Sequence, residues 1–236
     1  MNKFVHRKRK LSFRLNFNII MSKNPSCLLF TLILLIITGC SNPENNKLPI
    51  LGRKSIQEKT VNGTVKFDTV YHQIEDFIFT NQDSMEVTNT TFKNKIYVAD
   101  FFFTTCPTIC PIMKTQMLRV YEHFENDDGI MFLSHTIDPD YDTVALLHDF
   151  AERLGVSSNK WHFVTGPKEY IYEIGQNSYM VTAMEDENEP GGYLHSGAFI
   201  LVDPDRHIRG LYDGTKEDQV DRLISDIPKL LQEYGL

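Results

Sequence analysis

Residues 101–113 read FFFTTCPTICPIM, and this stretch decides the fold because an apolar run ends in it at a pair of cysteines. The preceding KIYVADFFF, residues 95–103, reads as a continuous apolar strand of the kind that is buried on both faces. The segment CPTICPIMKTQMLRVYEHF, which begins at Cys106, follows with helical periodicity. We therefore expect Cys106 and Cys110 at a strand-to-helix junction, four positions apart on one helix face.

Further strand and helix patterns alternate along the chain on both sides of this junction. A β-hairpin is predicted for residues 74–87 around the turn signal NQDS, and Asp142 is predicted to be the N-cap of a helix. Other strands are predicted at residues 129–137, 161–166, 196–203 and 206–214, and helices at residues 143–155, 167–179 and 216–234. This order indicates an α/β fold of the thioredoxin type, with a central mixed β-sheet flanked by helices and an N-terminal β-hairpin.

The first 39 residues differ in composition from the rest, with seven Lys or Arg and no Asp or Glu. Their apolar run, residues 28–37, is well short of the roughly 20 residues needed to span a membrane and suits the core of a signal peptide. The sequence ITGC resembles the bacterial lipobox, so Cys40 is predicted to become the lipidated first residue of the mature chain. A cleaved signal or an uncleaved anchor with an incidental cysteine is the alternative. Translation from Met21 instead of Met1 would give a more ordinary signal peptide.

The sequence predicts one folded domain, residues 66–236, behind a signal peptide (1–39) and a flexible tether (40–65). The tether is predicted because residues 41–66 are polar and have no periodicity. From residue 40 onward the chain has 17 basic and 31 acidic side chains, a formal charge of −14, which argues against binding to nucleic acid. We expect an exported lipoprotein that is anchored to a membrane and faces the periplasm or the cell exterior.

Cys106 and Cys110 are the sulfurs left for chemistry, since Cys27 lies in the predicted signal and Cys40 is consumed by lipid. Unpaired N–H groups and the macrodipole stabilise anions at a helix N-terminus, so we expect lowered thiol pKa values there. A structural disulfide would close a loop too short to restrict the unfolded chain much. A dithiol catalyst usually has two residues between its cysteines, not three. A metal site, with each sulfur about 2.3 Å from the ion, would need a third ligand.

Three stretches carry a resemblance to a known family: DFFFTTCPTICPIM (100–113), SHTIDPDYDTVALLHDFAERLG (134–155) and HSGAFILVDPDRHIRGLY (195–212). With them the sequence resembles, over residues 65–231, the SCO/SenC copper proteins, which help to assemble the copper centre of cytochrome c oxidase. The resemblance implies a thioredoxin-like fold in which Cys106, Cys110 and His195 bind copper. The two cysteines would form a disulfide when they are oxidised.

The expected ligand types agree with copper. Soft thiolates select Cu(I), while an imidazole also suits Cu(II), so a site with two sulfurs and one nitrogen can hold either oxidation state. Zinc is the alternative metal. Asp138 lies at a strand end where thioredoxin-like sites open, so it is expected either to support the ligands from behind or to be a plain turn or capping residue. Gly191 and Gly192 would let the loop before His195 approach the sulfurs.

The function predicted from these features is that of a membrane-tethered metallochaperone, and not primarily of an enzyme. Its partner would be the copper-bearing subunit of cytochrome c oxidase or another exported copper protein, and its contact with the membrane would be the lipid anchor. One alternative is a thiol-disulfide oxidoreductase in which Cys106 and Cys110 are the redox pair that acts on exported cysteine pairs. A copper or redox sensor is another.

Overall fold

The computed structural model describes residues 47–236 of the chain. The predicted signal peptide (1–39), the lipidation site Cys40 and the alternative start Met21 lie outside the described residues and stay predictions. The described residues belong to one compact unit. Within them no helix is both long and apolar enough to cross a membrane.

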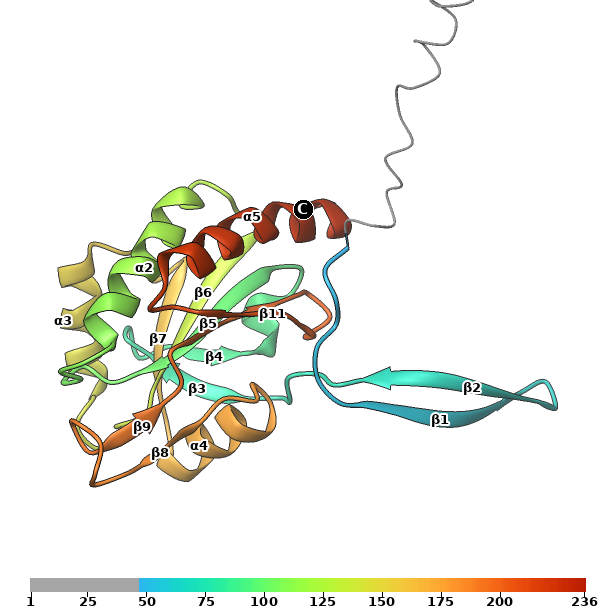
Figure 1. Ribbon diagram of the computed structural model, residues 1–236, viewed down its shortest axis with the longest axis horizontal. Coiled ribbons are helices and arrows are strands. Elements are labelled where there is room, and N and C mark those ends of the chain that lie inside the picture. The colour runs from blue at the N-terminus through green and yellow to red at the C-terminus, as the bar shows by residue number, and fades with distance from the viewer. Residues whose placement is uncertain (1–46) are drawn as a thin grey trace, which may run out of the picture. The chain divides into compact units, whose positions relative to one another are not determined.

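A seven-stranded mixed sheet forms the centre of the domain (Figure 1). Its strand order is β11-β10-β5-β6-β7-β3-β4, in which β5, β6 and β7 are parallel and the other neighbours are antiparallel. The strands are β3 (Ile78–Asn81), β4 (Glu86–Thr88), β5 (Ile96–Phe102), β6 (Ile130–Thr136), β7 (Trp161–Thr165), β10 (Ala198–Val202) and β11 (Ile208–Asp213). The mixed sheet and the β3–β4 hairpin confirm the predicted α/β architecture.

The described residues form four α-helices, and a short 3₁₀-helix, η2 (Asn89–Phe92), follows β4. The helices are α2 (Cys110–His123), α3 (Val144–Leu154), α4 (Lys168–Asn177) and α5 (Glu217–Tyr234). α2 packs against α5 on one side of the sheet, and α4 covers the other side (Figure 1).

Strand β5 is buried along its whole length, as its apolar sequence predicts, because helices cover both of its faces. On one face, the ring of Phe102 lies 4.0 Å from the ammonium group of Lys114 in α2. On the other, the ring of Phe101 lies so close to Gly175 of α4 that a Cβ there would approach it to 3.1 Å. β5 is thus held from both sides just before the cysteines.

Helix α2 starts at Cys110 and not at Cys106, so the prediction that both cysteines share one helix face is wrong. Cys106 lies in the preceding turn, where its backbone N–H donates to the carbonyl of Phe103 at 3.3 Å. Pro107 disfavours a helical conformation at Cys106, because the residue before a proline is sterically restricted. Pro111 is in the first turn of α2, where its missing N–H costs little.

Part of the predicted tether, residues 40–65, forms a β-hairpin, so the expectation of an irregular segment is wrong there. β1 (Lys54–Val61) and β2 (Thr64–Tyr71) pair antiparallel on either side of Asn62 and Gly63. Both turn residues have positive φ values, 53° and 74°, as a two-residue hairpin turn of type I′ requires. The Asn-Gly pair was the sequence signal for this hairpin. Its role as a tether stays a prediction.

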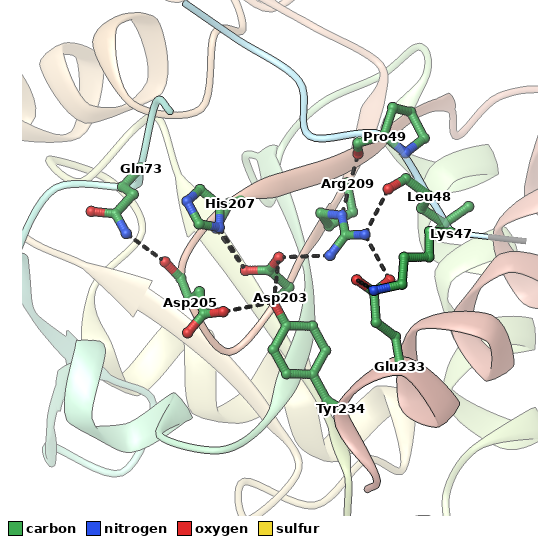
Figure 2. Close-up of polar contacts among 10 residues, drawn as sticks. All are labelled: Lys47, Leu48, Pro49, Gln73, Asp203, Asp205, His207, Arg209, Glu233 and Tyr234. Carbon is green, nitrogen blue, oxygen red and sulfur yellow. Dashed lines mark hydrogen bonds and ion pairs between the residues drawn. The ribbon is translucent and has the colours of Figure 1, made fainter. Parts of the chain in front are cut away.

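Arg209 of β11 fixes the chain just before this hairpin (Figure 2). Its guanidinium donates to the carbonyl groups of Leu48 at 2.6 Å and Pro49 at 3.2 Å. The same group pairs with Asp203 at 2.9 Å and Glu233 at 2.8 Å. The segment that leads into β1 is therefore attached to the sheet and to α5.

Asp203 also belongs to a cluster of potential metal ligands, because one ligand atom each from Asp203, Asp205 and His207 lies within 4.8 Å of the others. Figure 2 shows that the cluster is already engaged: Asp203 accepts from Arg209, and the Tyr234 hydroxyl donates to both aspartates at 2.9 and 2.8 Å. These bonds assign the cluster to the attachment network of the N-terminal segment.

Candidate metal centre

Both motif cysteines are buried beside the end of β5. Cys106 lies in the turn after that strand and Cys110 is the first residue of α2. Their exposed fractions are 7% and 5%, and a side-chain hydrogen bond joins the two thiol groups. The structure therefore brings two of the three predicted ligands together, through a turn and a helix start.

The pKa of Cys110 is raised, which contradicts the expectation of a lowered thiol pKa at the helix N-terminus. The largest cause is the hydrogen bond with Cys106, and burial is the next, since both favour the protonated thiol. A hydrogen bond from the backbone of Phe103 and the charge of Lys114 act in the opposite direction and are outweighed. A metal ion must therefore displace a proton from Cys110 when it binds.

The two cysteines line a cavity of about 350 Å³ between α2 and α3. Its walls are mostly apolar, and Lys114 is the charged side chain among them. The other lining residues are Phe103, Thr104, Pro111, Thr115, Leu118, Phe150 and Leu154. The two cysteines thus lie, nearly buried, among mostly apolar side chains.

The predicted third ligand, His195, ends a short two-stranded ribbon. β8 (Ala183–Glu185) and β9 (Tyr193–His195) pair antiparallel, with Ala183 opposite His195. The position of the His195 side chain lies outside what the structure describes, so its role as a ligand stays a prediction.

The backbone before β9 lies directly against the cysteine turn at Gly191. A Cβ on Gly191 would lie 3.0 Å from the ring of Phe103 and 3.1 Å from Pro107, and the φ of this glycine is +90°. Only glycine permits both the close approach and this backbone conformation. Gly192 shares the positive φ, +83°, but faces open space.

Residues on both sides of His195 lie close to the segment that carries the cysteines. Before it, the ring of Tyr193 packs against that of Phe103 with centroids 5.0 Å apart. After it, a Cβ on Gly197 would lie 3.7 Å from Cδ1 of Ile109, the residue next to Cys110. The main chain of His195 is thus held beside the cysteine turn.

Asp138, which follows β6, is tied to the same ribbon. Its carboxylate accepts a hydrogen bond from the Tyr193 hydroxyl, and this bond and burial, the larger cause, raise the pKa of Tyr193. Its carbonyl group accepts from the backbone N–H groups of Tyr141 at 3.2 Å and Asp142 at 2.8 Å. Asp138 therefore both shapes its turn and holds a residue two positions from His195. Its predicted support of the metal ligands stays a prediction.

Asp142 has a role that its sequence position did not indicate. The N-cap of α3 is Thr143, not Asp142 as predicted. Asp142 instead accepts hydrogen bonds from the backbone N–H of Thr104, at 3.1 Å, and from the hydroxyl groups of Thr104 and Thr136. Burial raises its pKa, although these three bonds lower it. The buried carboxyl group fixes the turn that leads to Cys106.

A buried ion pair beneath the cysteines also escaped the sequence analysis. The ammonium group of Lys114, one helical turn after Cys110, lies 2.7 Å from the carboxylate of Asp100 in β5. Ser134 donates to the same carboxylate and accepts from the indole N–H of Trp161 at 2.9 Å. Asp100, the single acidic residue in the apolar run of β5, was the feature of the sequence that could have indicated this ion pair. A lysine that lines the cavity thus has its countercharge beneath it.

These features define the class of the protein: a thioredoxin-like α/β domain with a buried C-x-x-x-C pair at the end of its first parallel strand. The model of the SCO1/SenC family matches residues 68–232. The chain therefore belongs to the SCO1/SenC family, which confirms the resemblance found in the sequence.

Three relatives illustrate the match. The SCO1 protein homolog of Bacillus subtilis is 32% identical over 162 residues, which cover 68% of this chain and 83% of the relative. A second relative is the solved structure of BsSco, which is described as a member of the Sco family of cytochrome c oxidase assembly proteins with a disulfide switch. It has 30% identity and a TM-score of 0.60, and the match covers 67% of this chain and 93% of that one. The copper-bound crystal structure of ScoI from Arabidopsis thaliana has 25% identity and a TM-score of 0.57, covering 68% and 98%.

Proposed function

We propose that this chain binds copper through Cys106, Cys110 and His195 and delivers it to the copper centre of cytochrome c oxidase during assembly. The observation that carries the proposal is the buried, hydrogen-bonded cysteine pair, beside which both flanks of His195 lie. Membership of a family with a copper-bound relative, and with a member described as an oxidase assembly protein, supports the choice of metal and of partner.

The residues of the site have separate tasks in this proposal. Cys106 and Cys110 supply soft sulfur donors, which favour Cu(I), and the imidazole of His195 also accommodates Cu(II). Phe103 and the other apolar walls of the cavity would limit the access of water to the sulfurs. Lys114 places a positive charge at the same cavity, and this charge partly offsets the negative charge of the two thiolates.

Delivery would proceed by ligand exchange, in which a cysteine or histidine of the partner displaces one of the three ligands. The partner would be the copper-bearing subunit of the oxidase or another exported copper protein. Lipid attached to Cys40 would hold the chain at the membrane surface on the exported side, so that the site meets a partner embedded in the same membrane. Mass spectrometry of the mature N-terminus tests this anchor.

Single substitutions of the three ligands test the copper site. We expect Cys106→Ser, Cys110→Ser and His195→Ala each to lower the copper that remains bound after dialysis against a weak chelator. His123→Ala is the matched control, because His123 is an exposed histidine at the end of α2. Full copper retention by Cys110→Ser would refute the site.

The second candidate function is thiol-disulfide exchange, in which one cysteine attacks a partner disulfide and the other resolves the mixed disulfide. The hydrogen bond between the two thiol groups and the disulfide switch described for BsSco favour it. The raised pKa of Cys110 disfavours it, since the thiolate is the nucleophile. His195→Ala separates the functions, because dithiol exchange would survive this change and copper retention would not. A sensor would leave oxidase assembly intact when the chain is deleted.

A further inference from the structure

The β1–β2 hairpin exposes side chains that a free surface rarely shows. No side chain of β1 or β2 is buried, and Ile56 and Phe67 are 74% and 69% exposed. The two strands form a sheet of their own, which Figure 1 shows apart from the central sheet. Because a lone two-stranded hairpin is marginally stable in water, a partner for its apolar side chains is expected.

The most exposed apolar side chains of the hairpin, Ile56, Phe67 and Val65, lie on one face, while the less exposed Val61 and Val70 lie on the other. Ile56 is opposite Thr69, Glu58 is opposite Phe67, and Thr60 is opposite Val65, and residues opposite each other or two apart share a face. Lys54 and Tyr71 continue this face, with the ammonium group 5.1 Å from the ring centroid. The face therefore combines Ile56, Val65, Phe67 and Tyr71. The other face has Gln57, Lys59, Lys66 and Asp68 at its centre.

The hairpin also differs in charge from the rest of the domain. Residues 53–71 contain four basic and two acidic side chains, a net charge of +2. Residues 72–236 contain 12 basic and 28 acidic side chains, a net charge of −16. Within the folded domain, the hairpin is thus the part whose charge suits an anionic surface.

We propose that the apolar face of the β1–β2 hairpin docks on the surface of an anionic lipid bilayer. Aromatic and aliphatic side chains enter the headgroup region together with Lys54 of the same face. Lys59 and Lys66 on the opposite face add long-range attraction to the anionic headgroups. This proposal rests on the proposed membrane location of the chain.

The length of the connecting chain supports a bilayer as the occupant. Leu48 is held by Arg209 and lies eight positions after the predicted lipid attachment at Cys40. Eight extended residues reach at most about 29 Å, and a strand of eight residues is about 27 Å long. A lipidated Cys40 would therefore keep Leu48, six residues before the hairpin, within about 29 Å of the bilayer, a distance similar to the length of the hairpin. Docking would then limit the orientations in which the copper site meets a membrane partner.

Lipid quenching of tryptophan tests the proposal on the full chain. The native chain has one tryptophan, Trp161, which is fully buried and gives a constant background. We place a second at Phe67→Trp on the apolar face or, as the matched control, at Gln57→Trp on the polar face. In proteoliposomes of phosphatidylglycerol and brominated phosphatidylcholine, we expect the added indole of Phe67→Trp to be blue-shifted and about twofold quenched relative to unbrominated lipid. The added indole of Gln57→Trp should be unchanged.

Equal quenching in the two variants, or none in Phe67→Trp, would overturn the proposal. A blue shift in Phe67→Trp without quenching would also overturn it, because a second copy or another protein would then cover the face. Quenching that is as strong in purely zwitterionic vesicles would refute the requirement for anionic lipid. Copper retention, measured on the same samples, reports the proposed function separately, since the hairpin contains none of its ligands.

Discussion

Removal of the Lys114 ammonium group should be among the most damaging single changes in this domain. Lys114 and Asp100 are 2.7 Å apart, and their side chains are 6% and 0% exposed. In Lys114→Met the apolar stem is largely kept, but the ring of Phe102 loses the ammonium group above it and the carboxylate of Asp100 loses its buried countercharge. The substitution thus removes the charge with little loss of volume.

The magnitude follows from this burial. A broken buried pair leaves an uncompensated charge, so Lys114→Met should lower the free energy of unfolding by ~3–5 kcal/mol. The double variant Asp100→Asn/Lys114→Met removes both charges, and the amide of Asn can still bond to Ser134. We therefore expect the double variant to be more stable than Lys114→Met alone, within about 1–2 kcal/mol of the native chain.

Urea unfolding of residues 43–236, reduced and free of metal, measures both effects through the midpoint and the slope. Lys93→Met is the control, because this lysine is exposed and its loss should change the free energy of unfolding by less than about 0.5 kcal/mol. The reasoning fails if Lys114→Met costs less than about 1 kcal/mol. It also fails if the double variant is no more stable than the single one.

Three further predictions concern the site and the core. Because the pKa of Cys110 is raised, copper binding should release protons and weaken as pH falls. Calorimetry in buffers of different ionisation enthalpy should detect those protons. An affinity that does not depend on pH would contradict this prediction. Gly191→Ala should lower copper retention, because the added Cβ would lie 3.0 Å from the ring of Phe103. Gly192→Ala is the control, since it has a similar positive φ without the clash. Equal effects of the two substitutions would exclude the contact as the cause. Burial lowers the pKa of His135 from 6.5 to about 4, so its stabilising contribution is present above pH 6.5 and decreases by up to ~3 kcal/mol as pH falls toward 4. His135→Leu should flatten the dependence of unfolding free energy on pH in that range, and an unchanged slope would assign it to other groups.

The sequence predicted those parts of the fold in which burial alone decides the structure. β5 and β6 are buried along their whole length, so their apolar runs were sufficient evidence. The start of α2 was different, because the helical pattern continues backward through Pro107 while the backbone before a proline does not. The raised pKa of Cys110 could not be predicted from the sequence either. It depends on the hydrogen bond with the neighbouring thiol and on burial, and both effects outweigh the expected lowering at a helix N-terminus.

The third ligand shows most clearly what a pattern cannot supply. His195 is eighty-five residues beyond Cys110, and only the family resemblance singled it out from the other histidines. The fold brings its main chain near the cysteines through contacts that have no period: Gly191 against Pro107, and Tyr193 between Phe103 and Asp138. None of these contacts involves the side chain of a predicted ligand. A change at any of them should therefore alter copper retention without altering the ligands. Loss of the Tyr193 hydroxyl in Tyr193→Phe isolates one of them, because the ring contact with Phe103 stays while the bond to Asp138 is lost.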